Sequence, residues 1–316
     1  MIEAIGGYFS LELPRHEEYH TEAVKLNTGR NCLEYILRCR KPNKVYIPFY
    51  TCDATLEPFQ KLNINYEFYH IDTKLEIFDN ISLYADEYLL YTNYFGLKQT
   101  YIEQLADRFG HYLIIDNTQA FFAKAISGID TFYTCRKFFG VPDGAYLYTN
   151  AQPDFEIEQD ASYERMTALL KRIDVSPETG YADFVNTESS LSNQPIRRMS
   201  KLTERIMQSI DYSRVSERRR LNYNIIHKVL GKSNLLHLDL ETDATPMVYP
   251  YLSDTGKLRE KLIQNRIYVA RYWPNIVNWT EKETIEYNLM QHLLPLPIDQ
   301  RYGEFSMDSI LKNMVL

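Results

Sequence analysis

Short apolar segments alternate with helix-like segments between residues 29 and 149, and this alternation constrains the fold more than any other feature of the chain. Aromatic or β-branched runs bounded by turn residues are typical of strands, and they occur at 44–49, 65–72, 88–95, 111–117 and 144–149. Apolar residues with helical spacing occupy 29–41, 53–63 and 100–110. Strands that alternate with helices predict an α/β fold, with a mainly parallel mixed sheet between layers of helices.

The predicted secondary structure changes twice in the second half of the chain. From about residue 155 to 230 the spacing is helical, except for a polar, turn-rich segment at 176–195 that predicts a surface loop. A strand–helix–strand pattern follows at 244–252, 254–267 and 268–274. We therefore expect a large domain over residues 1–230 and a small C-terminal α/β domain over 231–316.

The helix expected just before residue 230 carries two features of interest. Its apolar stripe is formed by Leu221, Ile225 and Val229, which we expect to face the core. The run Arg218–Arg220 predicts either a solvated helix face or a contact for a nucleotide diphosphate.

The composition is that of a globular protein, with 45% hydrophobic and 24% charged residues among 316. A net charge of −7 argues against nucleic acid as the main partner. No apolar run is long enough to span a bilayer, and the N-terminus lacks the features of a signal peptide. The 4 cysteines form no C-x-x-C pair, and the 7 histidines are scattered along the chain. We expect a cytoplasmic protein with free thiols, no metal site and no membrane partner.

The first candidate site residues precede the helix that is predicted to start near residue 29. Thr28, Gly29 and Arg30 combine a hydroxyl, free backbone N–H groups and the positive end of a helix dipole, which together suit a phosphate. Taken alone, the same residues predict a simple helix N-cap.

The second candidate is Asp116, which follows the apolar run at 111–115. Ligands of parallel sheets bind at the carboxyl ends of the strands, so this carboxylate is placed to pair with a cation or a protonated ring nitrogen. The alternative is a turn or N-cap aspartate.

The third candidate is Lys137, which lies among aromatic residues in TCRKFFGVPDGAYL (134–147). Burial against Phe138 and Phe139 would lower the pKa of the lysine and make it a nucleophile, and the Thr134 hydroxyl would face the same pocket. The alternative is a surface lysine with a packed stem.

The order of these three features is more informative than any one of them. A phosphate-binding helix start, a strand-end acid and a lysine are the three groups that a pyridoxal phosphate site needs. We therefore predict pyridoxal 5'-phosphate as the cofactor.

Several motifs in the same order resemble the sugar aminotransferases of the DegT/StrS-like family, which are fold-type I pyridoxal phosphate enzymes. The similar segments run from about residue 5 to the end of the chain and are GGYFSLEL, NTGRNCL, IPFYTCDAT, YTNYFG, DNTQA, RKFFGVPDGAYL, RRMSKLTERI and LLPLPID.

The resemblance implies a function and a set of site residues. Lys137 would bind the cofactor covalently and move protons, Asp116 would pair with the ring nitrogen, and Gln119 would lie beside the ring. The activity implied is amino transfer, with glutamate as donor, to a nucleotide-linked keto-sugar. Surface polysaccharide or lipopolysaccharide synthesis would be the setting, and the enzyme would be a homodimer.

The chain departs from the family pattern at several positions. Cys52 replaces the aromatic residue that stacks on the ring, so Tyr50, Tyr94 or Phe95 would have to serve. Phe132 replaces a phosphate-binding serine, and Ile196 replaces an asparagine donated across the dimer, for which Asn193 or Arg197 would substitute. Arg271 and Arg198 are candidate substrate contacts with an equally plausible structural role.

Two other functions remain open from the sequence. The departures favour a scaffold or binding subunit that has lost its chemistry, whereas the presence of Asp116, Gln119 and Lys137 favours an enzyme. A pyridoxal phosphate enzyme that acts on a small amino or keto acid is the second alternative.

Overall fold

A computed structural model of the chain describes residues 5–254 and 256–314. Its main sheet has the strand order β3-β2-β4-β5-β6-β7-β1-β9-β8. The strands are β1 (Val24–Leu26), β2 (Lys44–Pro48), β3 (Asn65–Tyr69), β4 (Glu87–Thr92), β5 (Leu113–Asp116), β6 (Asp130–Thr134), β7 (Ala145–Tyr148), β8 (Glu158–Gln159) and β9 (Arg197–Arg198). The neighbouring strands β3, β2, β4, β5 and β6 are parallel to one another. The next three strands, β7, β1 and β9, each run antiparallel to the strand before them in the sheet. The predicted α/β class with a mainly parallel mixed sheet is confirmed.

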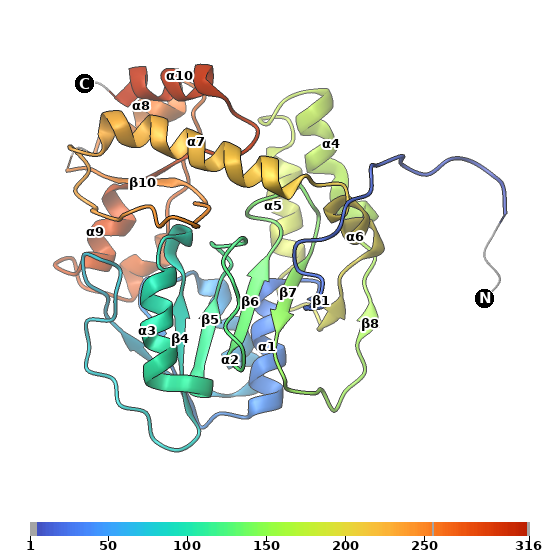
Figure 1. Ribbon diagram of the computed structural model, residues 1–316, viewed down its shortest axis with the longest axis vertical. Coiled ribbons are helices and arrows are strands. Elements are labelled where there is room, and N and C mark those ends of the chain that lie inside the picture. The colour runs from blue at the N-terminus through green and yellow to red at the C-terminus, as the bar shows by residue number, and fades with distance from the viewer. Residues whose placement is uncertain (1–4, 255, 315–316) are drawn as a thin grey trace.

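Helices cover both faces of this sheet (Figure 1). Successive strand residues point to opposite faces, so Ile114 packs with the residues of α1 while Ile115 packs in the larger cluster with those of α3. The helices are α1 (Gly29–Arg40), α2 (Glu57–Leu62), α3 (Gln99–Phe109), α4 (Thr167–Asp174), α5 (Tyr181–Ser190), α6 (Lys201–Met207), α7 (Tyr212–Leu230), α8 (Leu258–Gln264), α9 (Ile285–His292) and α10 (Glu304–Met314). None of the helices in the described ranges is long and apolar enough to cross a membrane.

The C-terminal part holds a two-stranded antiparallel sheet of β10 (Tyr249–Leu252) and β11 (Leu293–Leu296). The strand predicted at 268–274 is wrong, because this segment is irregular and leads into a 3₁₀ turn at Pro274–Asn278. The partner of β10 is instead the Leu-Pro segment near the end of the chain, which local periodicity did not single out. Helix α7 packs on α10 and β10, and the domain boundary at residue 230 stays a prediction.

Two further expectations are corrected by the structure. The segment 176–195 contains helix α5 and is not a long loop. The stripe predicted to be buried on α7 is wrong for Leu221 and Val229, which are exposed. The buried face of α7 instead includes Val215, Ile226 and Leu230. The polar Asn222 also lies on this face, because it donates to the backbone carbonyls of Ile298 and Tyr302.

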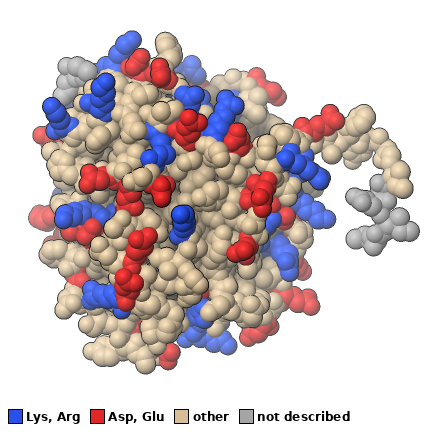
Figure 2. Space-filling model, in the orientation of Figure 1, with Lys and Arg blue, Asp and Glu red and all other residues tan. Residues whose placement is uncertain are grey.

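Positive and negative side chains are mixed over the face shown in Figure 2, and the N-terminal segment stands away from the body of the molecule. This visible face shows no extended basic area of the kind that binds nucleic acid.

Candidate active site

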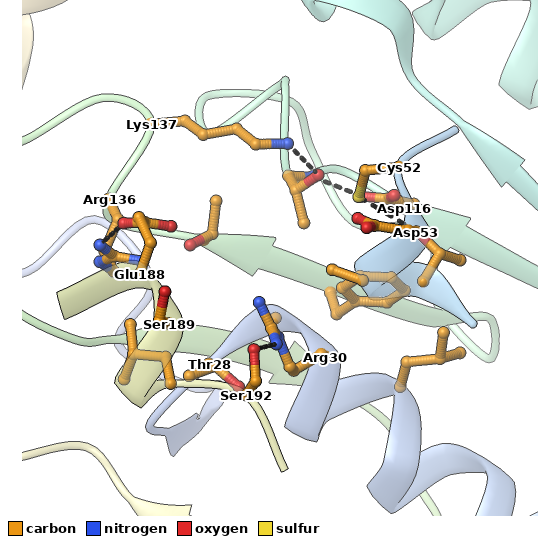
Figure 3. A pocket seen from close by; sticks show the side chains of 18 of the residues that line it. Thr28, Arg30, Cys52, Asp53, Asp116, Arg136, Lys137, Glu188, Ser189 and Ser192 are labelled. Atoms are coloured by element: carbon orange, nitrogen blue, oxygen red, sulfur yellow. Dashed lines mark hydrogen bonds and ion pairs between the residues drawn. The ribbon is translucent and has the colours of Figure 1, made fainter. Parts of the chain in front are cut away.

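A cavity of about 550 Å³ lies where the carboxyl ends of β5 and β6 meet the N-terminus of α1 (Figure 3). Six of the predicted site residues line it, namely Thr28, Gly29, Arg30, Asp116, Thr134 and Lys137. Strand register explains this meeting, because Thr92 pairs with Asp116, and Asp116 with Phe132, at the same edge of the sheet.

The start of helix α1 forms one wall of the cavity. The Thr28 hydroxyl accepts a hydrogen bond from the backbone N–H of Asn31 at 3.2 Å, which caps the helix. A Cβ atom added at Gly29 would lie 3.2 Å from the Cγ2 atom of Thr118, so only glycine lets the helix approach this turn without displacement. The N–H groups of a first helical turn have no partner within the helix and attract anions.

Two arginines of the cavity wall are held by carboxylates. The Arg30 Nη1 atom lies 2.7 Å from the Glu57 carboxylate and 3.1 Å from the Ser192 hydroxyl. Arg136 forms an ion pair with Glu188 of α5. Both guanidinium groups are therefore partly neutralised, so an anion that enters the cavity would compete with Glu57 and Glu188 for them.

Asp116 lies at the end of β5 and is only 7% exposed. Its Oδ1 atom accepts from the Thr118 N–H at 2.8 Å, and its Oδ2 atom accepts from the Thr92 hydroxyl at 3.5 Å. The residue stabilises the turn after the strand, as a turn aspartate does, and it also lines the cavity.

Lys137 reaches the cavity from the loop after β6, and its Nζ atom donates to the Thr118 hydroxyl at 3.0 Å (Figure 3). The expected burial of Lys137 is wrong, because its side chain is exposed. In the tight turn after β6, the N–H groups of Phe138 and Phe139 both donate to the Cys135 carbonyl. Phe138 and Phe139 are buried in the core, so neither desolvates the lysine.

Five other predicted residues are not among the described residues that line this cavity. Gln119 is buried, and its side chain accepts from the Phe95 N–H at 3.0 Å. Tyr50 and Phe95 are fully buried and pack on the rings of Trp273 and Tyr272. The other two, Arg198 and Arg271, are exposed elsewhere. Cys52 lies in the cavity wall, so the wall carries a thiol at this position.

The sequence prediction missed part of the cavity wall. Thr118 belongs to the DNTQA motif and Arg136 precedes Lys137, so a signal for both was present. No local signal identified Phe184, Glu188, Ser189, Leu191 and Ser192, because the chain reaches the cavity there through α5.

The sequence matches no known protein family and no curated protein. Solved structures do resemble it. A DegT DnrJ EryC1 StrS aminotransferase from Brucella abortus is 16% identical, with 92% of this chain and 84% of that chain covered at a TM-score of 0.57. The sugar aminotransferase CalS13 from Micromonospora echinospora is 15% identical, with 93% and 87% covered and a TM-score of 0.58. Spr1654 from Streptococcus pneumoniae, in its PLP form, is 13% identical, with 93% and 86% covered and a TM-score of 0.62.

The chain has the fold of these aminotransferases. Their group includes the family that the sequence motifs resemble, so the motifs and the overall structure point the same way.

Proposed function

We propose that this protein is a pyridoxal phosphate-dependent aminotransferase that acts on a keto-sugar. The observation that carries the proposal is the meeting of Lys137, Asp116 and the N-terminus of α1 at one cavity. These groups come from separate strands and loops, and a merely structural lysine or aspartate would not need the other two.

The described residues fit the cofactor at three points. The first turn of α1 and the hydroxyls of Thr28 and Thr134 would hold the phosphate, beside the narrow approach at Gly29. The Asp116 carboxylate would hold a proton on the ring nitrogen. Lys137 would be the residue that binds the cofactor covalently.

When bound, pyridoxal phosphate supplies an aldehyde that condenses with amines and a ring that withdraws electrons from the adjacent carbon. The Lys137 amine, released from its hydrogen bond to Thr118, would take the proton from the α-carbon of the amino donor. In the second half of the reaction it would deliver a proton to the sugar carbon that receives the amine. Thr118 would accept from the lysine between these steps and keep its amine directed into the cavity.

The finer assignments rest on the family resemblance. We propose glutamate as the amino donor, a nucleotide-linked keto-sugar as the acceptor, and surface polysaccharide or lipopolysaccharide synthesis in the cytoplasm as the setting. The similar structures include a sugar aminotransferase, which supports the sugar class.

A homodimer is part of the proposal. The chain exposes large apolar side chains on its N-terminal arm, residues 5–12, and Lys137 is open to solvent in one copy of the chain. A second copy would cover the arm and exclude water from the lysine.

The test is an absorbance spectrum of the purified protein with added pyridoxal phosphate, followed by borohydride and peptide mass spectrometry. Wild type and Lys124→Ala, which removes an exposed lysine elsewhere in the chain, should both give a cofactor band and a fixed cofactor. Lys137→Ala should give neither. If wild type fixes no cofactor, the enzyme proposal fails, and a scaffold subunit becomes the better interpretation.

A further inference from the structure

The loop that carries Lys137 is held through the backbone of the next residue. The carbonyl oxygen of Phe138 accepts from the Gln300 side-chain amide at 2.7 Å and from Arg219 Nη2 at 3.4 Å. Arg219 lies on α7, and Gln300 follows β11, so both donors come from elements far along the chain. Two side chains thus converge on one carbonyl beside the lysine.

Arg219 is only 1% exposed and makes several further contacts. Its Nε atom donates to the Gln300 Oε1 atom at 3.0 Å, its Nη1 atom donates to the Met247 carbonyl at 2.8 Å, and its guanidinium carbon lies 4.4 Å from the centre of the Phe138 ring. Burial lowers the pKa of Arg219 to about 10, so the group stays charged at neutral pH. The N–H groups of Arg219 donate to neutral oxygens, and the Asp299 carboxylate nearby stabilises its charge without a direct ion pair among the described residues.

A second cavity lies between this loop and the C-terminal part of the chain. This space of about 190 Å³ is lined by Lys137, Arg219, Tyr272 and Asp299, among others. The side chains of Phe138 and Phe139 anchor the loop in the core, and the hydrogen bonds to the Phe138 carbonyl restrain its backbone beside the space that Lys137 lines.

We propose that Arg219 and Gln300 are positioning residues that hold the Phe138 carbonyl so that the Lys137 amine points into the first cavity. The inference rests on the proposed function for its chemical meaning. It places the alignment of the reactive lysine under the control of the C-terminal part of the chain.

The test compares Arg219→Lys and Gln300→Glu with the control Arg218→Gln. Lysine keeps the charge of Arg219 but cannot replace its several N–H donors. Gln300→Glu keeps an acceptor for Arg219 Nε but cannot donate to the Phe138 carbonyl, so it removes the shorter of the two hydrogen bonds on that carbonyl. Arg218→Gln removes a charge from the adjacent, partly exposed position of α7.

Two readouts separate the positioning role from stability and from the proposed function. The first is trace acetylation of the protein without cofactor, measured as the ratio of label on Lys137 to label on Lys124. The second is the rate at which borohydride fixes added pyridoxal phosphate to Lys137. Thermal unfolding is measured for every variant.

We expect both test variants to change the acetylation ratio and to slow fixation by on the order of tenfold, since small misplacements of a reacting group have effects of this size or larger. The control should match wild type in both. Wild-type behaviour of a folded Gln300→Glu variant would overturn the proposal, even if Arg219→Lys fails to fold. If wild type fixes no cofactor but the acetylation ratio still changes, the proposed function fails and the positioning role stands.

Discussion

His20 shows how a single buried side chain sets the pH response of this protein. It is 2% exposed, with its Nε2 atom 2.8 Å from the Phe121 carbonyl and its Nδ1 atom 3.1 Å from the Tyr148 hydroxyl. A neutral ring with its proton on Nε2 donates to the carbonyl and accepts from the tyrosine. Burial lowers the pKa of His20 to about 4 from 6.5, despite the opposing hydrogen bond to Phe121.

This pKa predicts a loss of stability in weak acid. The unfolded chain binds the proton more readily than the folded chain, so the contribution is fully present above about pH 6.5 and is lost as the pH falls toward 4. The expected loss is roughly 3 kcal/mol. Denaturant unfolding of wild type and His20→Gln across this range isolates the effect, since all carboxyl groups are shared. An unchanged difference between the two proteins at every pH would contradict the assignment.

Gly144 has a backbone conformation that residues with a side chain rarely adopt. It follows Asp143 in the turn before β7 and has a φ of +110°. A Cβ atom there would lie 2.8 Å from Thr203 Cγ2 and 3.0 Å from Cys135 Sγ. Gly128 also has a positive φ, of +81°, but a Cβ atom there would meet nothing within 4 Å.

We expect Gly144→Ala to destabilise the protein by about 1–3 kcal/mol more than Gly128→Ala. Both substitutions strain the backbone, but only Gly144→Ala also brings the new methyl group too close to its neighbours. Thermal or urea unfolding of the two variants measures the difference. Equal losses would show that the neighbours of Gly144 move aside freely.

At the scale of elements, α5 differs from the other walls of the cavity. None of its residues is buried, and Tyr181 and Phe184 are exposed. The Arg136–Glu188 ion pair and the hydrogen bond between Arg30 and Ser192 tie α5 and the turn after it to the body. Helix α1, in contrast, buries a run of residues from Asn31 to Leu37.

We therefore expect backbone amides of α5 to exchange with deuterium faster than those of α1, since few buried contacts oppose local opening. Glu188→Gln should accelerate exchange in α5 further and leave α1 unchanged. Hydrogen exchange with mass spectrometry resolves both segments. Equal protection of α5 and α1 would show that the helix is held by contacts other than the ion pair.

At the scale of the whole molecule, the N-terminal arm has no described partner for its apolar side chains. Ile5, Tyr8 and Phe9 are 100%, 99% and 92% exposed. The arm is tied to the body only after these residues, where Arg205 donates to the carbonyls of Leu13 and Pro14. Isolated apolar residues on a surface are normal, but a continuous exposed segment suggests a contact surface.

Removal of residues 1–12 should weaken the proposed dimer by at least about tenfold in Kd, because full burial of even one large apolar side chain contributes about 1.5–3 kcal/mol. Sedimentation equilibrium of the full and shortened chains measures this change. Substitution of Phe78, an exposed apolar residue elsewhere in the chain, by serine is the matched control. A shortened chain that dimerises as well as the full chain would exclude the arm from the interface.

The order of elements in the first half of the chain was predictable for a local reason. The periodicity of a strand or a helix depends on residues that are neighbours in the sequence. The predicted ranges therefore agree within a few residues with the observed bounds of β2, β4, β5, β7, α1 and α3. The same periodicity failed where other contacts dominate. The segment 268–274 is apolar without being a strand, and α7 buries Arg219 and Asn222 because distant carbonyls accept their hydrogen bonds.

The sequence by itself determined the α/β class and the chain order of Thr28, Asp116 and Lys137, because strand ends in a parallel sheet lie at one edge whatever packs around them. Only the tertiary structure decided which side chains share the cavity. It placed Arg136 beside Glu188 of α5, and it left Cys52 and not Tyr50 in the cavity wall. It also left Lys137 exposed and buried Arg219. These outcomes depend on contacts between residues far apart in the chain, and such contacts leave no local pattern.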